Sequence, residues 1–382
     1  MPMKYFQILV VFVAVLSAWI SLANAATATA PDYNTLEQAA LKGDSQSLAQ
    51  LEAGANSGNA NAQYDLGAYY YSGNQYDDAF NWFQKAAEQG HAKAQYNLGY
   101  CYANSLGTKQ DYVKAFYLFK KAAEQGLAGA EDSVGSCYTT GEGVAQDFTQ
   151  SFNWYLKAAK QGFAIAEYNV GVDYSNGIGV RKDYVQAFNW FQKSAAQDVA
   201  QGEYNLGYAY IQGLGTRQNY QQAFYWFQKA AMQNYIEAEY SLGALYEKGL
   251  GTLQDYTQAF NWYQKAAEQG YANAEFALAT LYNLGSGTSQ DYNQAFNWYL
   301  KAAEQGMAEA QDNLGVFYAK GVGTAQDYAQ AFYWFQKAAL QNNINACKSL
   351  SYMYSQGLGV TSDQQKAQYW AERAQQLQSN GN

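Results

Sequence analysis

Apolar and polar positions follow two helical patterns that recur together along most of the chain. In the first pattern, Ala94, Leu98 and Cys101 fall at i, i+4 and i+7, on one face of an α-helix. In the second pattern, Ala187 and Phe191 mark the apolar face four residues apart. The period is 36 residues, as the tryptophan series shows: Trp82, Trp154, Trp190, Trp226, Trp262, Trp298, Trp334 and Trp370, with Leu118 in the one missing place. Two helices per unit at a fixed period predict an all-α solenoid of stacked helix-turn-helix repeats.

Polar residues mark both ends of the second helix of each unit. Candidate N-caps precede it, namely Asp147, Asp183, Asn219, Asp255, Asp291 and Asp327. Three residues later stand glutamines that predict a capping box: Gln150, Gln186, Gln222, Gln258, Gln294 and Gln330. The predicted ends are Gly90, Gly126, Gly162, Gly270 and Gly306, replaced elsewhere by Asp198, Asn234 and Asn342. These residue types best tolerate the left-handed conformation that ends a helix.

Glycines recur at two further places in most units. One lies inside the first helix, as Gly99 does, where glycine costs about 1 kcal/mol relative to alanine. We expect it to let the partner helix approach closely. The other place is a Gly-x-Gly turn between the two helices, as at Gly177 and Gly179. It follows a helix and lacks the lysine of a phosphate-binding loop, so we interpret it as a turn.

The ends of the chain differ from the repeats. Residues 1–25 predict a cleavable signal peptide, with Lys4 before an apolar stretch and Ala23-Asn24-Ala25 at the cleavage site. We expect a flexible segment over 26–34, a helical cap over 35–60 and a polar tail over 379–382. Nine repeats fill 61–378, the first being 32 residues long. No later segment predicts a membrane span.

Composition narrows the function classes. The net charge is −9, with 23 Lys and Arg against 32 Asp and Glu, so the chain lacks the basic surface that nucleic acid requires. A single histidine, His91, excludes most metal sites and catalytic triads that depend on imidazole. No cofactor is expected.

The motifs resemble the Sel-1-like repeat family, a relative of the tetratricopeptide repeats. Leu98-Gly99-x-x-Tyr102 is similar to its first helix, and the run from Trp190 to Ala195 is similar to its second. The resemblance implies a right-handed α/α superhelix whose first helices line a concave, protein-binding face. One branch of the family has a disulfide in every repeat, from which this chain departs. Cys101 and Cys137 lie one repeat apart, about 10 Å by helix-packing distances, beyond disulfide reach. With Cys347 they are expected to be buried or incidental thiols.

Candidate binding residues lie on the first helices, turned away from the core stripe, at the positions of Tyr96, Tyr100 and Ala103. They vary between units, as a surface that recognises an irregular partner would. The candidates are Tyr71, Tyr96, Tyr100, Asp132, Tyr168, Tyr204, Tyr208, Tyr240, Glu247, Phe276, Asp312 and Tyr352. Tyr96, Tyr168, Tyr204 and Tyr240 could equally be packing residues, and Tyr100, Tyr208 and Tyr352 are expected to be exposed. The acids could pair with basic groups of a partner or be solvated.

Catalytic groups are sparse. No Ser-x-x-Lys motif supplies a nucleophile. Asp77-Asp78 and Glu131-Asp132 are expected at surface positions, and His91 is expected to face solvent. The sequence therefore favours an exported, non-enzymatic, monomeric scaffold in the periplasm or secreted from a Gram-negative bacterium. It would bind a protein or extended peptide. The alternative is a cell-wall-related enzyme or a β-lactam-binding or peptidoglycan-binding protein, as in the penicillin-binding branch of the family.

Overall fold

The computed structural model describes residues 32–380, which form 20 helices and no strand. They group into two compact units, one ending at Gly202 and the other beginning at Glu203. The predicted signal peptide lies outside the described residues. So do residues 26–31 of the predicted flexible segment and residues 381–382 of the tail.

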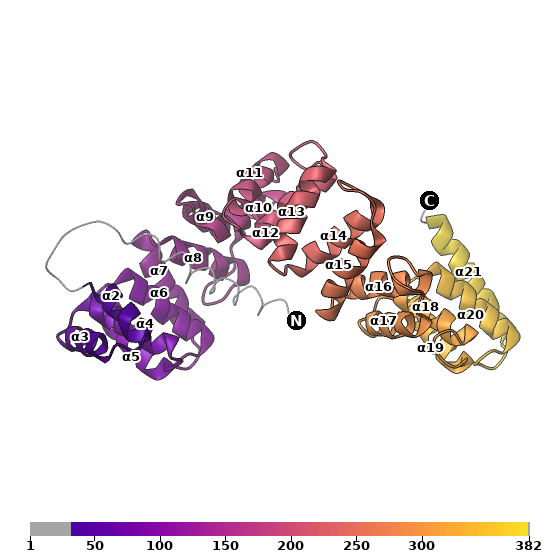
Figure 1. Ribbon diagram of the computed structural model, residues 1–382, viewed down its shortest axis with the longest axis horizontal. Coiled ribbons are helices and arrows are strands. Elements are labelled where there is room, and N and C mark those ends of the chain that lie inside the picture. The colour runs from indigo at the N-terminus through magenta and orange to yellow at the C-terminus, as the bar shows by residue number, and fades with distance from the viewer. Residues whose placement is uncertain (1–31, 381–382) are drawn as a thin grey trace. The chain divides into compact units, whose positions relative to one another are not determined.

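The first unit begins with a pair of cap helices, followed by alternating first and second helices of the repeats (Figure 1). The cap helices are α2 (Tyr33–Leu41) and α3 (Ser45–Asn56), so helix starts at Tyr33, within the segment expected to be flexible. The repeat helices are α4 (Ala60–Ser72), α5 (Tyr76–Glu88), α6 (Ala92–Asn104), α7 (Tyr112–Glu124), α8 (Ala128–Thr140), α9 (Phe148–Lys160), α10 (Ala164–Asn176) and α11 (Tyr184–Ala195).

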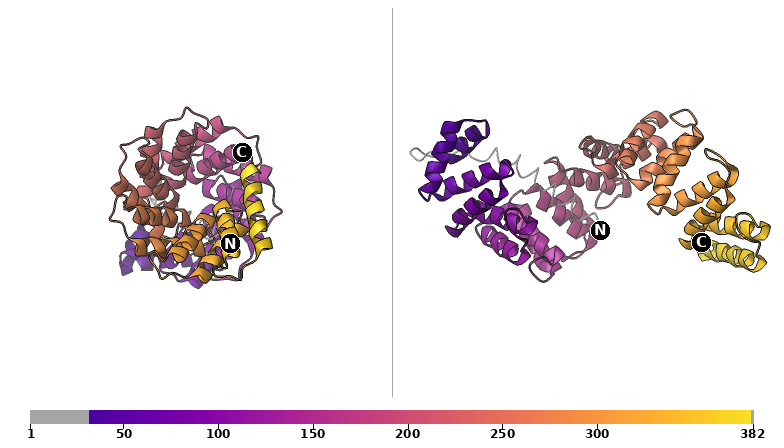
Figure 2. Two further views of the ribbon diagram at one scale, coloured as in Figure 1. Left: turned by 90° about the vertical axis from the view of Figure 1, so that its right-hand side faces the viewer. Right: turned by 90° about the horizontal axis from the view of Figure 1, so that it is seen from below.

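The second unit continues the alternation, and consecutive helices lie side by side within it (Figure 2). The boundary between the units falls in α12 (Ala200–Gln212). The remaining helices are α13 (Tyr220–Met232), α14 (Ile236–Lys248), α15 (Tyr256–Glu268), α16 (Ala272–Leu284), α17 (Tyr292–Glu304), α18 (Ala308–Lys320), α19 (Tyr328–Leu340), α20 (Ile344–Gln356) and α21 (Gln364–Asn380).

The hydrophobic core is built at the junctions between repeats. In the first unit, Ala115 and Phe119 of α7 pack in one cluster with Val134 and Cys137 of α8, which belongs to the next repeat. Each repeat therefore needs its neighbour to bury its apolar face, as expected for a solenoid. The three cysteines are buried and free, as predicted.

The second helices begin at the predicted caps, but the predicted capping box does not form. Asp147 accepts hydrogen bonds from the backbone N–H groups of Thr149 and Gln150, at 2.9 and 3.0 Å. The N–H group of Asp147 itself donates to the carbonyl oxygen of Tyr138 in the preceding helix, at 3.0 Å. That donor is thus unavailable to a glutamine side chain, and it ties the two helices of the repeat together.

The predicted helix-ending residues adopt the left-handed conformation. Gly90 and Gly126 both have φ of 85°. Where glycine is absent, Asp198, Asn234 and Asn342 have φ of 58°, 60° and 66°. The substitution of glycine by Asp or Asn at this place is therefore confirmed as a conformational match.

The glycine inside the first helix permits the close approach that the sequence predicts. A Cβ atom added to Gly171 would lie 2.6 Å from Cδ1 of Phe191, and one added to Gly99 would lie 2.9 Å from Cδ1 of Phe119. Such distances are shorter than real carbon contacts. The aromatic ring of the second helix thus packs directly on the backbone of the first.

The Gly-x-Gly turn packs against the preceding repeat. A Cβ atom at Gly143 would overlap the backbone carbonyl of Tyr112, the first residue of α7, and one at Gly179 would overlap that of Phe148 in α9. Both glycines also have positive φ, 76° and 67°. This explains the recurring glycine as a packing requirement between repeats, without a phosphate ligand.

Candidate binding surface

We define the helix-A face as the side chains at the positions of Tyr96, Tyr100 and Ala103 in each repeat. In each repeat they follow one face of the first helix, one turn apart. The candidate residues on it fall into packed rings, exposed rings and acids.

The rings at the Tyr96 position pack inside the repeats. Tyr96 is buried, with its ring centroid 5.6 Å from that of Phe119. In the second unit, the ring centroid of Tyr240 lies 5.5 Å from that of Tyr263 and 5.4 Å from that of Tyr271. The same arrangement holds for the other rings at this position: Tyr168 on Phe191, Tyr204 on Phe227 and Phe276 on Tyr299. Of the two interpretations left open by the sequence, these contacts favour packing for Tyr96.

The rings at the Tyr100 position are more accessible. Tyr208 is 45% exposed and Tyr352 is 61% exposed, as expected. Tyr100 is half-buried, so its expected exposure is only partly realised, and Tyr71, at the Ala103 position, is also half-buried. Tyr208 and Tyr352 are therefore the tyrosines of this face that a partner can reach most directly.

The acids of the helix-A face are less exposed than expected. Asp132 and Asp312 are buried, and burial raises their pKa values to about 7 and about 6. Glu247 is half-buried and accepts a hydrogen bond from the Tyr263 hydroxyl, at 2.6 Å. The expectation of a surface position for Asp132 is wrong, because α8 packs against helices on both sides.

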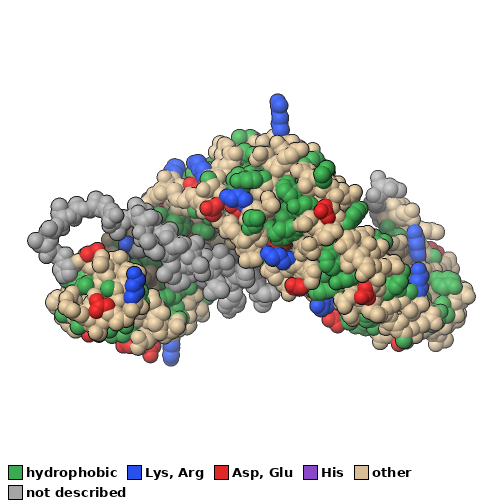
Figure 3. Space-filling model, in the orientation of Figure 1, with side chains coloured by type: hydrophobic (Ala, Val, Ile, Leu, Met, Phe, Trp, Pro, Cys, Tyr) green, Lys and Arg blue, Asp and Glu red, His purple; other side chains and the backbone are tan. Residues whose placement is uncertain are grey.

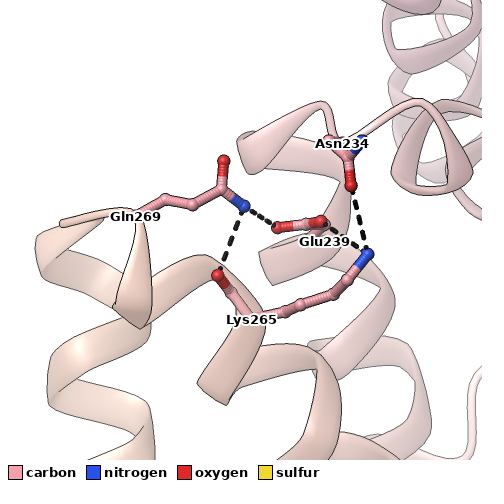
Figure 4. A network of polar contacts seen from close by, with 4 residues as sticks. All are labelled: Asn234, Glu239, Lys265 and Gln269. Carbon is pink, nitrogen blue, oxygen red and sulfur yellow. Dashed lines mark hydrogen bonds and ion pairs between the residues drawn. The ribbon is translucent and has the colours of Figure 1, made fainter.

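Glu131 is also buried, against expectation, and belongs to a recurring polar network. Its counterparts are Glu167, Glu203, Glu239 and Glu275. In Figure 4, Glu239 of α14 receives a hydrogen bond from Gln269, at 2.6 Å, and an ion pair from Lys265, at 3.3 Å. Lys265 also lies 5.2 Å from the centre of the Trp262 ring. These glutamates join the two helices of a repeat, so they are structural charges.

Two further expectations concerned the exposure of Asp77-Asp78 and of His91. Asp77 and Asp78 are exposed, as expected. His91 does not simply face solvent, since it stacks on Tyr64 with ring centroids 4.8 Å apart and its Nδ1 caps α6 by accepting from Ala94 N–H, at 3.1 Å. Burial lowers the pKa of His91.

One polar cluster was not anticipated from the sequence. It lies among α8, α9 and α10 in the first unit and is called here the α8–α10 cluster. Its members are Asp132, Ser136, Thr139, Ser151, Tyr155, Asn169 and Asp173. A signal was present in the sequence. Ser151 stands where the other repeats have alanine, and Asp173 stands where most have an apolar residue or cysteine, as at Cys137 and Leu245.

Charge is scattered over the face of the molecule that Figure 3 shows. On the face shown in Figure 3, lysines, arginines and acids are separated by polar and hydrophobic side chains, without a continuous basic patch. Residues 32–380 contain no group of three side chains suited to a metal ion. Within the same range, none of the helices has both the length and the apolar character that crossing a bilayer requires.

Helical hairpins whose cores close only between neighbours define the protein as an α-solenoid. The family model of the Sel1 repeat matches nine successive segments: 60–91, 92–127, 129–163, 164–199, 200–235, 236–271, 272–307, 308–343 and 344–377. The chain therefore belongs to the Sel1 repeat family, whose members generally mediate protein–protein interaction.

The solved structures similar to the chain include two that share more than 30% identity with it. The first is c5321, described as a protective antigen of uropathogenic Escherichia coli with an SLR fold. It is 36% identical, with a TM-score of 0.58, over 86% of this chain and 79% of that one. The second is a Sel1 repeat protein from Oxalobacter formigenes, 34% identical with a TM-score of 0.57, over 64% of this chain and 96% of that one. No curated protein sequence matches.

Proposed function

We propose that the protein is an exported, non-enzymatic scaffold that binds a protein or an extended peptide along the helix-A face. The observation that carries the proposal is that the core positions keep the same residues in most repeats, whereas a surface position of the helix-A face varies. The core glycines and alanines recur from repeat to repeat, whereas the Tyr100 position changes from Tyr100 to Ser136, Val172 and Tyr208. A position that packing does not fix, and that holds exposed tyrosine, suits recognition of a partner.

The test uses exposed tyrosines on the first and on the second helices of the second unit. Tyr208 and Tyr352 lie on the helix-A face, whereas Tyr225 and Tyr333 lie on second helices and are 49% and 45% exposed. A photo-crosslinking residue is placed at each position in cells of the source bacterium, and crosslinked proteins are identified by mass spectrometry. We expect one partner at positions 208 and 352 and none at 225 and 333.

The partner is then purified and its affinity measured. Replacing Tyr208 and Tyr352 by alanine should weaken binding at least tenfold, because each truncation of a central interface tyrosine removes about 1–2 kcal/mol. The Tyr225→Ala/Tyr333→Ala variant should bind like the parent. Equal loss in both variants, or crosslinks confined to 225 and 333, would contradict a helix-A binding face.

Export and the absence of catalysis have their own tests. The proposal of export rests on the predicted leader, and the description of c5321 as a protective antigen agrees with it. Cell fractionation and N-terminal sequencing should find the chain outside the cytoplasm, beginning after Ala25. Incubation with a chromogenic β-lactam should give no turnover and no covalent adduct. Either one would favour the cell-wall enzyme alternative.

A further inference from the structure

The α8–α10 cluster replaces apolar packing by polar groups at one place in the first unit. The preceding repeat shows the usual arrangement, with Tyr96, Ala115, Phe119 and Cys137 in contact in one cluster. The corresponding residues around α9 are Asp132, Ser151, Tyr155 and Asp173. Several polar residues at neighbouring positions of one core are destabilising unless they hydrogen-bond to one another or to a ligand.

The cluster satisfies part of its own hydrogen-bonding capacity. Asn169 of α10 donates to Oδ1 of Asp132, at 2.9 Å. Thr139 shares hydrogen bonds with the Ser151 hydroxyl and with the Tyr155 hydroxyl. Burial raises the pKa of Tyr155, and the fields of the Asp132 and Asp173 carboxyls raise it further, so both carboxyls act on that phenol.

One acceptor in the cluster has no partner. Asp173 is only 6% exposed, and its Oδ2 atom makes no hydrogen bond within residues 32–380. Neither Asp173 nor Asp132 is ion-paired in that part of the chain. A buried carboxyl without a donor is destabilising, and burial raises the pKa of Asp173 to about 7.

One member of the cluster lies at the surface of the helix-A face. Ser136, one helical turn after Asp132 on α8, is exposed, and Thr139 is half-buried beside it. Asp132 itself stands where the neighbouring first helices carry Tyr96 and Tyr168, so a ring is missing above Tyr155. A side chain bound at Ser136 would lie beside the Tyr155 hydroxyl, on which both carboxyls act.

We propose that the α8–α10 cluster is a subsite for a cationic side chain, lysine or arginine, of the partner segment that binds the helix-A face. The inference rests on the proposed function and specifies the partner's chemistry. An ammonium or guanidinium group supplies the donor that Asp173 lacks and the positive charge that two buried carboxyls favour. Each such hydrogen bond would be charge-assisted, in a site screened from water.

The test measures binding of small cationic probes to the purified full chain. The probes are Nα-acetyl-lysine methylamide and Nα-acetyl-arginine methylamide, with Nα-acetyl-norleucine methylamide as the neutral control. Binding is followed by NMR of protein carrying ¹³C-labelled aspartate carboxyls. We expect the cationic probes, and not norleucine, to shift the Asp132 and Asp173 resonances at low millimolar concentration.

Two variants separate recognition from folding. Asp173→Ala installs the residue that Ala209 provides at the equivalent position. It should weaken probe binding at least tenfold while raising the urea midpoint, because the unpartnered carboxyl is gone. Glu124→Gln, an exposed acid at the end of α7, is the matched control and should bind normally.

The outcomes distinguish this inference from the proposed function. Equal binding of norleucine, unchanged binding by Asp173→Ala, or no shift of either resonance would overturn the cationic subsite. Crosslinking of a partner at Tyr208 and Tyr352 is a separate measurement in the second unit. If a partner is captured there although the cationic probes do not bind, the proposed function is retained and the subsite is rejected.

Discussion

At the scale of single residues, the glycine inside most first helices sets how closely the two helices of a repeat approach. Gly171→Ala should lower the urea midpoint, although alanine improves helix propensity by about 1 kcal/mol. The added Cβ would lie 2.6 Å from the Phe191 ring, and overpacking of this kind costs about 1–3 kcal/mol. Chemical denaturation followed by circular dichroism measures the difference.

The chain supplies the control for this substitution. Ala279 occupies the same position in α16. In that repeat the angle between the ring planes of Phe276 and Tyr299 is 55°, whereas the angle between those of Tyr240 and Tyr263 is 36°. Ala279→Gly should therefore also destabilise, because that repeat is already arranged around a Cβ. A raised midpoint for Gly171→Ala would show that close ring packing is not what requires glycine.

A second residue-scale prediction concerns the cap of α9. Asp147→Ala should cost about 1 kcal/mol, because two backbone N–H groups lose their acceptor. Gln150→Ala should be nearly neutral, since the Asp147 N–H group already donates to Tyr138. Urea titration of both variants checks the pair. An equal loss in the two would indicate that the glutamine closes a capping box in solution.

At the scale of helices, the buried glutamates hold the end of each second helix against the first helix of its repeat. Glu239→Gln should change stability little, because Gln95 and Gln311 occupy this place in other repeats and bond the same way, to Gln125 and Gln341. Glu239→Ala should cost about 1–3 kcal/mol, because it removes the buried carboxylate that Gln269 and Lys265 both bind. Thermal denaturation of the two variants should separate them. Similar melting temperatures would contradict this assignment of the network.

The same scale explains what the sequence could and could not predict. Helix starts, helix ends and the glycine contacts follow from local pattern, because capping and backbone conformation depend on a few neighbouring residues. The burial of Asp132 and Glu131 does not, because a first helix packs against helices on both sides. The apolar stripe that contains Leu98 and Cys101 predicts only one of those contacts, and the other faces of the helix are then predicted to be exposed.

Over the whole molecule, buried acids dominate the pH response. Burial raises the pKa of Glu37 and of Asp65 to about 7, as it does for Asp132 and Asp173. In the unfolded chain such groups titrate near 4, so the folded protein binds more protons between about pH 4 and pH 7. The free energy of unfolding should therefore fall as the pH rises through that window.

The measurement is the urea midpoint at pH 5 and at pH 8, which should be higher at pH 5. Glu37→Gln/Asp65→Asn should reduce the difference, because both acids have raised pKa values and Asp65 adds to burial in raising that of Glu37. Below about pH 4 the sign reverses, since the cap carboxyls of Asp111 and Asp363 have lowered pKa values. A midpoint that rises from pH 5 to pH 8 would contradict the prediction.

The contact of the Gly-x-Gly turn with the preceding repeat is made to main-chain atoms, at a carbonyl that every second helix offers whatever its side chains. This contact between neighbouring repeats therefore depends little on the identity of their side chains. Whole units can be duplicated, deleted or exchanged during evolution without redesigning that contact. The length of such a protein, and the order of its recognition residues, can change one cassette at a time.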